Sequence, residues 1–350
     1  MNAADLPLSV RWDGATLHLL DQRRLPDTVQ VDPYVGMEEV FRAITELRVR
    51  GAPAIGIAAG YGLVLGMAPH RTADAGTFRA KLSDAAGYLR SARPTAVNLA
   101  WAVERVAAAG ADALAAHDAE AAWQAMREAA VALHEDDRRL CRAIGEHGVA
   151  LLGPGAGILT YCNAGALAVS ELGTASAPMY LAHAAGLRPR IVVCETRPLL
   201  QGARLTAWEL GRRGLDVTLI CDNMAAHVMA SGAIDLVLVG TDRVTRNGDV
   251  VNKIGTSALA ILARYFGIPF YVACPSSTFD PGTATGDAVP IEERGAEEVS
   301  GYATLRTAPA GIKVRNPAFD VTPAELVTAL ITDRGVIRPP YAETLRVLLR

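Results

Sequence analysis

Residues 153–165 read GPGAGILTYCNAG, and the character of the sequence changes at this stretch. Before it, from about Gly36 to Gly148, apolar residues recur at helical spacing, as in Met37–Ile44. After it, short β-rich runs alternate with helical patterns, which is typical of a parallel, doubly wound sheet. We therefore predict an α/β protein with a mainly helical domain over residues 1–148 and a parallel-sheet domain over residues 149–350.

Local signals place the elements within these two parts. In the first part, Ser9–Trp12 and Ala15–Leu20 flank Asp13-Gly14 and predict a β-hairpin. Helices are expected from near Ala54 with Pro53 in the first turn, over Leu99–Ala109 with Asn98 as the cap, and over 118–146. In the second part we expect strands Ile158–Tyr161, Arg190–Cys194, Val217–Ile220, Leu236–Val239 and Phe270–Ala273, and helices that include Leu200–Arg213 and Val251–Phe266.

Composition narrows the class of protein. The chain has 350 residues with 51% hydrophobic and 20% charged residues, which indicates a globular enzyme of two domains. The net charge of -3 gives no general attraction to nucleic acid or to an anionic membrane. Charged residues and glycines interrupt the apolar runs before membrane-spanning length, and no secretory signal is expected at the N-terminus. An odd number of cysteines, 5, without a Cys-x-x-Cys pair favours a reducing cytoplasm.

The sequence predicts no cofactor and no metal. The glycines at 153–157 resemble part of a dinucleotide fingerprint, but they precede a strand instead of following one, so a loop is the preferred interpretation. The 7 histidines show no metal-ligand spacing.

A thiol and a carboxylate follow two of the predicted strands. Cys162 follows Ile158–Tyr161, and Asp242 follows the most apolar strand of the chain. Ligands of parallel sheets bind beyond the carboxyl ends of the strands, so the two side chains are a candidate acid/base pair. An apolar surface beside Asp242 would raise the pKa of its carboxyl group. The alternatives are that Cys162 fills the core and that Asp242 caps a turn.

Further polar groups gather on the loops. The sequence 50–56, RGAPAIG, places Arg50 before a helix start, where it can hold a phosphate, and Arg93 precedes the next helix. Gln201 lies in a polar segment after a strand, and Asn252 and Lys253 are expected to open a helix. Solvated arginines and ordinary helix capping are the alternative interpretations. Together these residues indicate a small phosphorylated ligand and proton transfer without a metal.

Several long motifs, in order, closely resemble the methylthioribose-1-phosphate isomerase family, from about residue 8 to residue 341. They are RGAPAIG (50–56), YCNAG (161–165), ETRP with QGARLT (195–206), GTDR (240–243), NKIGT (252–256), PIEER (290–294) and NPAFDVTP (316–323). The superfamily also contains regulatory subunits of the exchange factor of eukaryotic translation initiation and a ribose-1,5-bisphosphate isomerase.

The resemblance implies a helical N-terminal domain on a Rossmann-like C-terminal domain, a homodimer, and the isomerisation of 5-methylthioribose 1-phosphate to 5-methylthioribulose 1-phosphate in methionine salvage. It implies that Cys162 and Asp242 are catalytic. It also implies that substrate is bound by Arg50, Gly51, Ala52, Arg93, Gln201, Asn252 and Lys253. The alternatives are an isomerase of ribose 1,5-bisphosphate or 5-deoxyribose 1-phosphate, and a non-catalytic regulatory subunit.

The segment Cys274-Pro275-Ser276 departs from the family pattern, in which we expect more aliphatic residues. The resemblance therefore does not determine the shape of this wall of the site. Among the thiols we expect Cys162 to be reactive, with Cys194 and then Cys274 as competitors. Cys141 and Cys221 are expected to act as packing residues.

Overall fold

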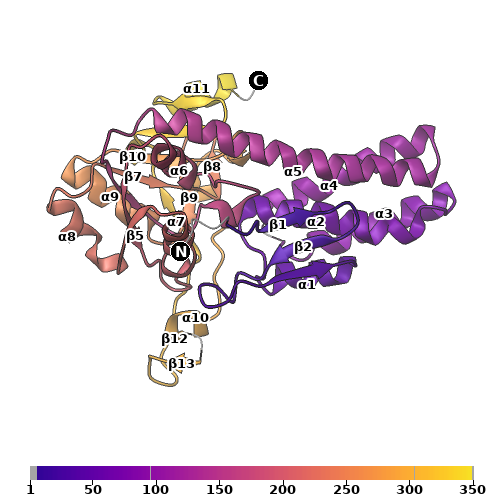
Figure 1. Ribbon diagram of the computed structural model, residues 1–350, viewed down its shortest axis with the longest axis horizontal. Helices are drawn as coiled ribbons and strands as arrows, with labels where there is room; N and C mark the ends of the chain where they lie inside the picture. The colour runs from indigo at the N-terminus through magenta and orange to yellow at the C-terminus, as the bar shows by residue number, and fades with distance from the viewer. Residues whose placement is uncertain (1–5, 95, 303, 349–350) are drawn as a thin grey trace. The chain divides into compact units, whose positions relative to one another are not determined.

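The computed structural model describes residues 6–94, 96–302 and 304–348, and the chain forms two compact units. The helical unit comprises Pro7–Arg139 and the short segment Ala166–Gly173. The sheet unit contains Leu140–Gly165 and the chain from Thr174 onwards. A helical N-terminal region and a C-terminal parallel sheet confirm the predicted fold class (Figure 1).

The helical unit begins with a small antiparallel sheet. Strands β1 (Val10–Trp12) and β2 (Leu17–Leu20) form the predicted hairpin, and β3 (Val31–Tyr34) adds an unpredicted third strand beside β2. The connection is longer than the expected two-residue turn, because Asp13 N–H donates to the carbonyl of Thr16 and the Asp13 carboxylate accepts from Ala15 and Thr16.

Five α-helices follow in the described part of the chain; the second forms the centre of this unit, and the fifth continues past Arg139 into the sheet unit. They are α1 (Met37–Thr45), α2 (Ala52–Met67) with a 3₁₀ turn at Ala68–His70, α3 (Ala75–Arg90), α4 (Val97–Ala116) and α5 (Ala119–Val149). Helix α2 is buried on nearly every side and starts at Ala52, with Pro53 in its first turn. In the described part of the chain, Ala52–His70 is the one helix long and apolar enough to cross a membrane, contrary to our expectation, but 72% of that window is buried inside the structure.

Helix α4 corrects one expectation. It begins at Val97 after the N-cap residue Ala96 and extends to Ala116, so Asn98 lies inside the first turn and is not the cap. The reason is packing against α2: a Cβ atom on Gly56 would lie 2.9 Å from the carbonyl oxygen of Asn98. Because Gly56 has no side chain, α2 and α4 approach closely at this point. This close packing favours a helical conformation at Asn98.

The sheet unit is built on seven strands in the order β16-β15-β10-β7-β4-β5-β6. All neighbours are parallel except the edge pair β15 and β16. The strands are β4 (Gly157–Thr160), β5 (Arg190–Cys194), β6 (Asp216–Ile220), β7 (Leu236–Val239), β10 (Phe270–Ala273), β15 (Ala329–Thr332) and β16 (Gly335–Ile337). The five predicted strands are therefore confirmed within one residue at each end.

Helices connect most of these strands, and one more helix follows the last strand. They are α6 (Ser176–Ala184), α7 (Ala207–Arg212), α8 (Ala225–Ala230), α9 (Thr256–Phe266) and the C-terminal α11 (Tyr341–Leu348). The helix expected over Leu200–Arg213 starts with one π-helical stretch, Gly202–Thr206, before α7. Such stretches occur frequently at functional sites.

A second sheet in the same unit corrects another expectation. Its order is β11-β8-β9-β14, with strands β11 (Phe279–Asp280), β8 (Arg243–Thr245), β9 (Val250–Lys253) and β14 (Phe319–Thr322). Asn252 and Lys253 therefore lie on a strand and do not open a helix. The β-branched pair Val250-Val251 fits the strand, and Gly255, at φ +103°, precedes the true helix start.

The remaining elements of the sheet unit form a small projection. Helix α10 (Glu297–Ser300) leads into the two-stranded hairpin of β12 (Gly301–Tyr302) and β13 (Leu305–Arg306). Figure 1 shows α10 and this hairpin lying away from the seven-stranded sheet. The Arg197 guanidinium ties α10 to the segment after β5 by donating to the carbonyls of Glu298 and Val299.

Candidate functional site

Cys162 and Asp242 follow the two strands on either side of the point where the strand order reverses. From β4 the chain continues to β5 on one side, whereas β7, the other neighbour of β4, continues to β10 on the opposite side. In open α/β sheets, ligands bind outside the carboxyl ends of the strands at this switch point. The thiol and the carboxylate therefore belong to the same edge of the sheet, the edge at which ligands are expected.

The main chain of Cys162 has an unusual conformation. Its φ angle is +61°, in the left-handed region that costs a residue with a side chain on the order of 1–3 kcal/mol. Cys162 N–H donates to Thr196 Oγ1 at 2.8 Å, and Thr206 Oγ1 donates to the carbonyl of Cys162 at 2.5 Å. The side chain is half-buried, which excludes the interpretation of a fully buried core filler.

Asp242 lies at the start of the β7–β8 connection. Its N–H donates to the carbonyl of Val251 on β9 at 3.1 Å, and Thr241 Oγ1 donates to the same carbonyl at 2.9 Å. Asp242 is exposed, so the apolar surroundings that we expected for its carboxylate are not observed. The reason is that β7 ends at Val239 and the chain turns towards β8 before residue 242.

Strand β9 brings Asn252 and Lys253 next to the residue that Asp242 contacts. Both side chains are buried. Asn252 Nδ2 donates to Thr256 Oγ1 at 3.0 Å, while Lys253 Nζ donates to the carbonyl of Ala318 at 3.1 Å and lies 4.9 Å from the centre of the Phe319 ring. A buried ammonium group held in this way is suited to an anionic ligand.

Tyr161 links the end of β4 to the segment after β9. Its hydroxyl group donates to the carbonyl of Ile254 at 2.9 Å, and a Cβ atom on Gly255 would lie 2.3 Å from the same hydroxyl. The residues flanking Cys162 and Lys253 therefore meet at one place in the sheet unit.

Gln201 lies immediately before the π-helical stretch that carries Thr206. Its side chain is 7% exposed, and Oε1 is buried without a hydrogen-bond partner among the described residues. A buried amide oxygen without a partner is costly, which favours a ligand donor such as a sugar hydroxyl group at this position.

The other predicted binding residues belong to the helical unit. Arg50, which is half-buried, precedes Gly51 and Ala52 at the start of α2, and Arg93 precedes α4; the residue at 95 lies outside the described part of the chain. Helices α2 and α4 pack with their N-terminal ends together, because Gly56 meets Asn98 and Gly60 meets Val106. Two helix N-termini with nearby arginines are an arrangement suited to a phosphate group.

The backbone conformation at residue 51 and the close approach of Ala168 both require a glycine there. Its φ angle is +94°, and a Cβ atom there would lie 2.4 Å from the carbonyl oxygen of Ala168. Buried Ser9 and Gln22 hold the same region, since both donate to the carbonyl of Leu167 at 2.7 Å. The N–H of Gln22 also donates to the carbonyl of Arg48, close to Arg50 in the chain, at 2.8 Å.

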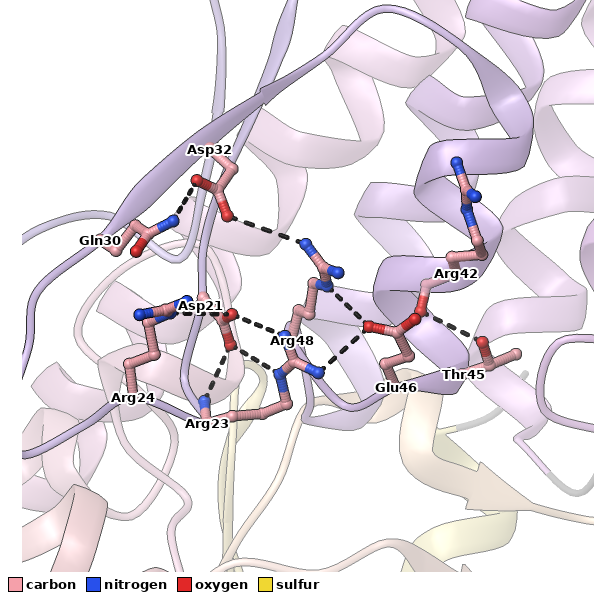
Figure 2. Close-up of polar contacts among 9 residues, drawn as sticks. All are labelled: Asp21, Arg23, Arg24, Gln30, Asp32, Arg42, Thr45, Glu46 and Arg48. Carbon is pink, nitrogen blue, oxygen red and sulfur yellow. Dashed lines mark hydrogen bonds and ion pairs between the residues drawn. The ribbon is translucent and has the colours of Figure 1, made fainter.

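Figure 2 shows a network of charged side chains around Arg48. Arg48 Nε and Arg23 Nη1 both donate to Glu46, at 2.9 and 3.1 Å, and Arg23 also pairs with buried Asp21. Burial opposes ionisation of Asp21, but the hydrogen bonds from Arg23 prevail and hold the pKa of that carboxyl below its usual value. The network fixes the turn that leads to Arg50.

The wall that departs from the expected pattern follows β10. Cys274 is buried, its N–H donates to the carbonyl of Ile331, and Ser276 Oγ donates to Asp333 Oδ2 at 3.0 Å. The segment is therefore anchored to the neighbouring strand β15 and its continuation.

The five cysteines are free, and they differ in burial. Burial raises the pKa of Cys194 to about 12, and burial also raises the pKa of Cys274. Cys221 is exposed, so the expectation that it packs in the interior is wrong: it lies just beyond β6, at the edge of the sheet. Within the described residues, no group of three or more His, Cys, Asp or Glu side chains is arranged to hold a metal ion.

Sequence reasoning missed the residues that hold the site in place: Ser9, Gln22, Thr196, Thr206 and Asp222. Asp222 accepts from the N–H groups of Thr196 and Arg197, both at 2.7 Å. The polar density of 194–204 pointed to this region, but the pairing of Thr196 with Cys162 depends on contacts between separate strands.

These features define a two-unit α/β protein with a thiol and a carboxylate at the switch point of a doubly wound sheet. The chain belongs to the Initiation factor 2 subunit family, whose family model matches residues 48–339.

Relatives with assigned activities align with nearly the whole chain. The chain is 52% identical to a 5-deoxyribose 1-phosphate isomerase of Moorella thermoacetica, over 97% of each chain. It is 49% identical to a methylthioribose-1-phosphate isomerase of Geobacillus kaustophilus, over 99% of this chain and 96% of the relative.

The chain is also similar to solved structures over nearly its whole length. The structure of 5-methylthioribose 1-phosphate isomerase from Pyrococcus horikoshii has a TM-score of 0.94 and 41% identity, over 99% of this chain and 97% of that one. The delta subunit of translation initiation factor eIF-2B from A. fulgidus has a TM-score of 0.89 and 44% identity, over 99% and 100% of the two chains.

Proposed function

We propose that this protein is an aldose–ketose isomerase that converts 5-methylthioribose 1-phosphate to 5-methylthioribulose 1-phosphate. The observation that carries the proposal is the position of Cys162 and Asp242 after β4 and β7, at the switch point of the sheet. The 49% identity to a methylthioribose-1-phosphate isomerase over almost the full length supports the choice of substrate.

Asp242 acts first in the proposed reaction. The phosphate on C1 prevents simple opening of the sugar ring to a free aldehyde. Asp242 donates a proton to the ring oxygen while the bond between this oxygen and C1 breaks, a step that requires bound substrate to cover the exposed carboxyl group and keep it protonated. The C2 hydroxyl group later loses its proton as the C2 carbonyl forms, and this proton restores the acid.

Cys162 acts as the base in the same scheme. Its thiolate removes the proton from C2 and returns it to C1, so that C2 is oxidised and C1 is reduced within one molecule. A direct hydride shift from C2 to C1 is the alternative route. Positioned proton transfer contributes roughly 10²- to 10⁴-fold to the rate.

The remaining residues bind the substrate in this proposal. Arg50, Arg93 and Lys253 act on the phosphate, together with the main chain at Gly51 and Ala52. Gln201 and Asn252 hydrogen-bond the sugar hydroxyl groups. The buried ammonium of Lys253 and the buried Oε1 atom of Gln201 support these two assignments.

Two other functions have specific support. The 52% identity to a 5-deoxyribose 1-phosphate isomerase favours that sugar as the second candidate substrate. The 44% identity to a translation initiation factor subunit keeps a non-catalytic regulatory role as a further alternative. A comparison of kcat/KM for 5-methylthioribose 1-phosphate, 5-deoxyribose 1-phosphate and ribose 1,5-bisphosphate separates them. The highest value is expected with the first sugar, and no turnover of any would favour the regulatory role.

We also propose a place in methionine salvage, a cytoplasmic location, a homodimer, and domains over residues 1–148 and 149–350. Five free cysteines support a reducing compartment. Light scattering of the purified protein tests the dimer directly, since a mass near the 36.9 kDa of a single chain would contradict it.

A further inference from the structure

We infer that Thr196 and Thr206 are positioning residues, which hold the main chain of Cys162 in the conformation that its thiol needs. The inference rests on the proposed catalytic role of Cys162. Neither threonine is among the residues that the resemblance implies for substrate or catalysis.

The two hydroxyl groups take both main-chain hydrogen-bonding groups of Cys162. Thr196 Oγ1 accepts from Cys162 N–H at 2.8 Å, and Thr206 Oγ1 donates to the carbonyl of Cys162 at 2.5 Å. At φ +61°, Cys162 holds a conformation that only surrounding contacts can maintain. The two threonines supply contacts of this kind from the segment between β5 and α7.

Each hydroxyl group has a second partner, which fixes its direction. Thr196 Oγ1 donates to the carbonyl of Cys194 at 3.1 Å, and Thr206 Oγ1 accepts from Asn163 Nδ2 at 3.1 Å. The side chains are 0% and 4% exposed, so water cannot easily replace a lost partner. Valine has the same shape as threonine but can make none of these bonds.

Thr196 is itself held in place from the end of β6. It has φ +67°, and its N–H donates to Asp222 Oδ1, while the N–H of Arg197 donates to Asp222 Oδ2. The 3₁₀ turn Asp222–Met224 carries this carboxylate. A chain of contacts therefore runs from Asp222 through Thr196 to Cys162, across the ends of three neighbouring strands, β6, β5 and β4.

The consequence for catalysis is geometric. Without either hydroxyl group the backbone can relax from its unusual conformation, and the thiol moves relative to the C2 proton. A displacement of about 1 Å can cost on the order of 100-fold in rate, even when substrate binding is unaffected. The effect should therefore be seen in kcat more than in KM.

The test compares Thr196→Val and Thr206→Val with Thr196→Ser and Thr206→Ser, which restore the hydroxyl groups. We expect each valine variant to lose about 10- to 100-fold in kcat with a much smaller change in KM, and each serine variant to recover most of the loss. Thr328→Val is the matched control: its hydroxyl accepts from Phe270 N–H at the opposite, amino end of the same sheet. This control should retain the wild-type kcat.

A second readout does not depend on turnover. The rate at which iodoacetamide labels Cys162 is measured against pH by mass spectrometry for each folded variant. The valine variants should show a displaced profile, and the serine and Thr328→Val variants should follow the wild type. Valine variants with wild-type kcat and a wild-type labelling profile would overturn the inference.

Two further variants keep the test decisive. If a valine variant fails to fold, Asp222→Asn serves instead, because it weakens the hold on Thr196 without changing size, and it should lower kcat in the same direction. Cys162→Ser distinguishes the catalytic role of Cys162 from the positioning role of the two threonines. Full activity of Cys162→Ser would refute the catalytic role of Cys162, whereas its inactivity combined with unaffected valine variants would refute only the positioning role.

Discussion

At the scale of single residues, the thiols differ in exposure and pKa, and this difference predicts which of them react. Iodoacetamide should label Cys162 in the free protein and leave it protected when a phosphorylated pentose is bound. Cys221 is exposed and should be labelled equally in both conditions. Cys194 and Cys274 should react slowly because burial raises their pKa and hides them.

Peptide mass spectrometry with and without the sugar phosphate gives this comparison, and Cys221 serves as the internal control. Equal labelling of Cys162 in the two conditions would count against a ligand site beside it.

Lys253 is expected to act through the phosphate. The variant Lys253→Met keeps most of the buried stem but removes the charge, and with it the contact of the ammonium group with the Phe319 ring. Loss of one charge-assisted bond to an anion should cost roughly 1.5–3 kcal/mol, or about 10- to 100-fold in kcat/KM. Arg50→Ala and Arg93→Ala should show losses of a similar size.

Steady-state kinetics measures these losses, with Lys81→Met as the control because Lys81 is exposed on α3. An unchanged kcat/KM for Lys253→Met would leave this lysine with a purely structural role.

At the scale of elements, the turn before α2 depends on Gly51. Gly51→Ala should destabilise the protein by about 1–3 kcal/mol from backbone strain, and by more from overlap with Ala168. Gly14→Ala is the matched control in the same unit, since Gly14 also has a positive φ angle, +105°, but no atom lies within 4 Å of the position that a Cβ atom would take there.

Urea unfolding of the two variants separates strain from overlap. We expect Gly51→Ala to lose clearly more stability than Gly14→Ala. Equal losses would mean that Ala168 moves away without cost.

The sequence predicted elements well where a single local pattern decides them. The strands at 236–239 and 270–273 are apolar throughout, and the strand at 190–194 is apolar after Arg190; all three match the structure within a residue. The prediction failed at 250–253, where a short strand pairs with β8 and β14, partners that no local pattern reveals. It also failed at Asn98, whose helical position follows from packing against Gly56.

The candidate site could be predicted in part for the same reason. Strand-end positions are visible in the sequence, so Cys162 and Asp242 could be proposed from their place alone. The hydrogen bonds of Thr196 and Thr206 with the main chain of Cys162 join residues from different segments of the chain. Only the folded structure brings these residues together.

At the scale of the whole molecule, a buried histidine should make stability depend on pH. His134 on α5 is 2% exposed and hydrogen-bonds the hydroxyl group of Tyr61 at 3.1 Å. Burial lowers the pKa of His134 to about 4, with a smaller effect of the charge on Arg138. In the unfolded chain this group titrates near its ordinary value of 6.5.

Because the unfolded state binds the proton more tightly, stability is lost as pH falls from 6.5 towards 4, and nothing is lost above 6.5. The contribution at pH 4.5 is about 2–3 kcal/mol. His134→Gln cannot titrate, so the difference in unfolding free energy between wild type and this variant should shift by that amount between about pH 7 and about pH 4.5. A constant difference would contradict the buried, neutral state of His134.

We propose that this protein isomerises 5-methylthioribose 1-phosphate with Cys162 as the base and Asp242 as the acid. The most direct measurement is an NMR assay of ketose formation from this sugar by wild type, Cys162→Ser and Asp242→Asn, with the fold of each checked by circular dichroism. We predict that the wild type forms 5-methylthioribulose 1-phosphate and that both folded variants fall below a few per cent of its kcat. Absence of ketose with the wild type, or substantial turnover by either folded variant, would refute this mechanism.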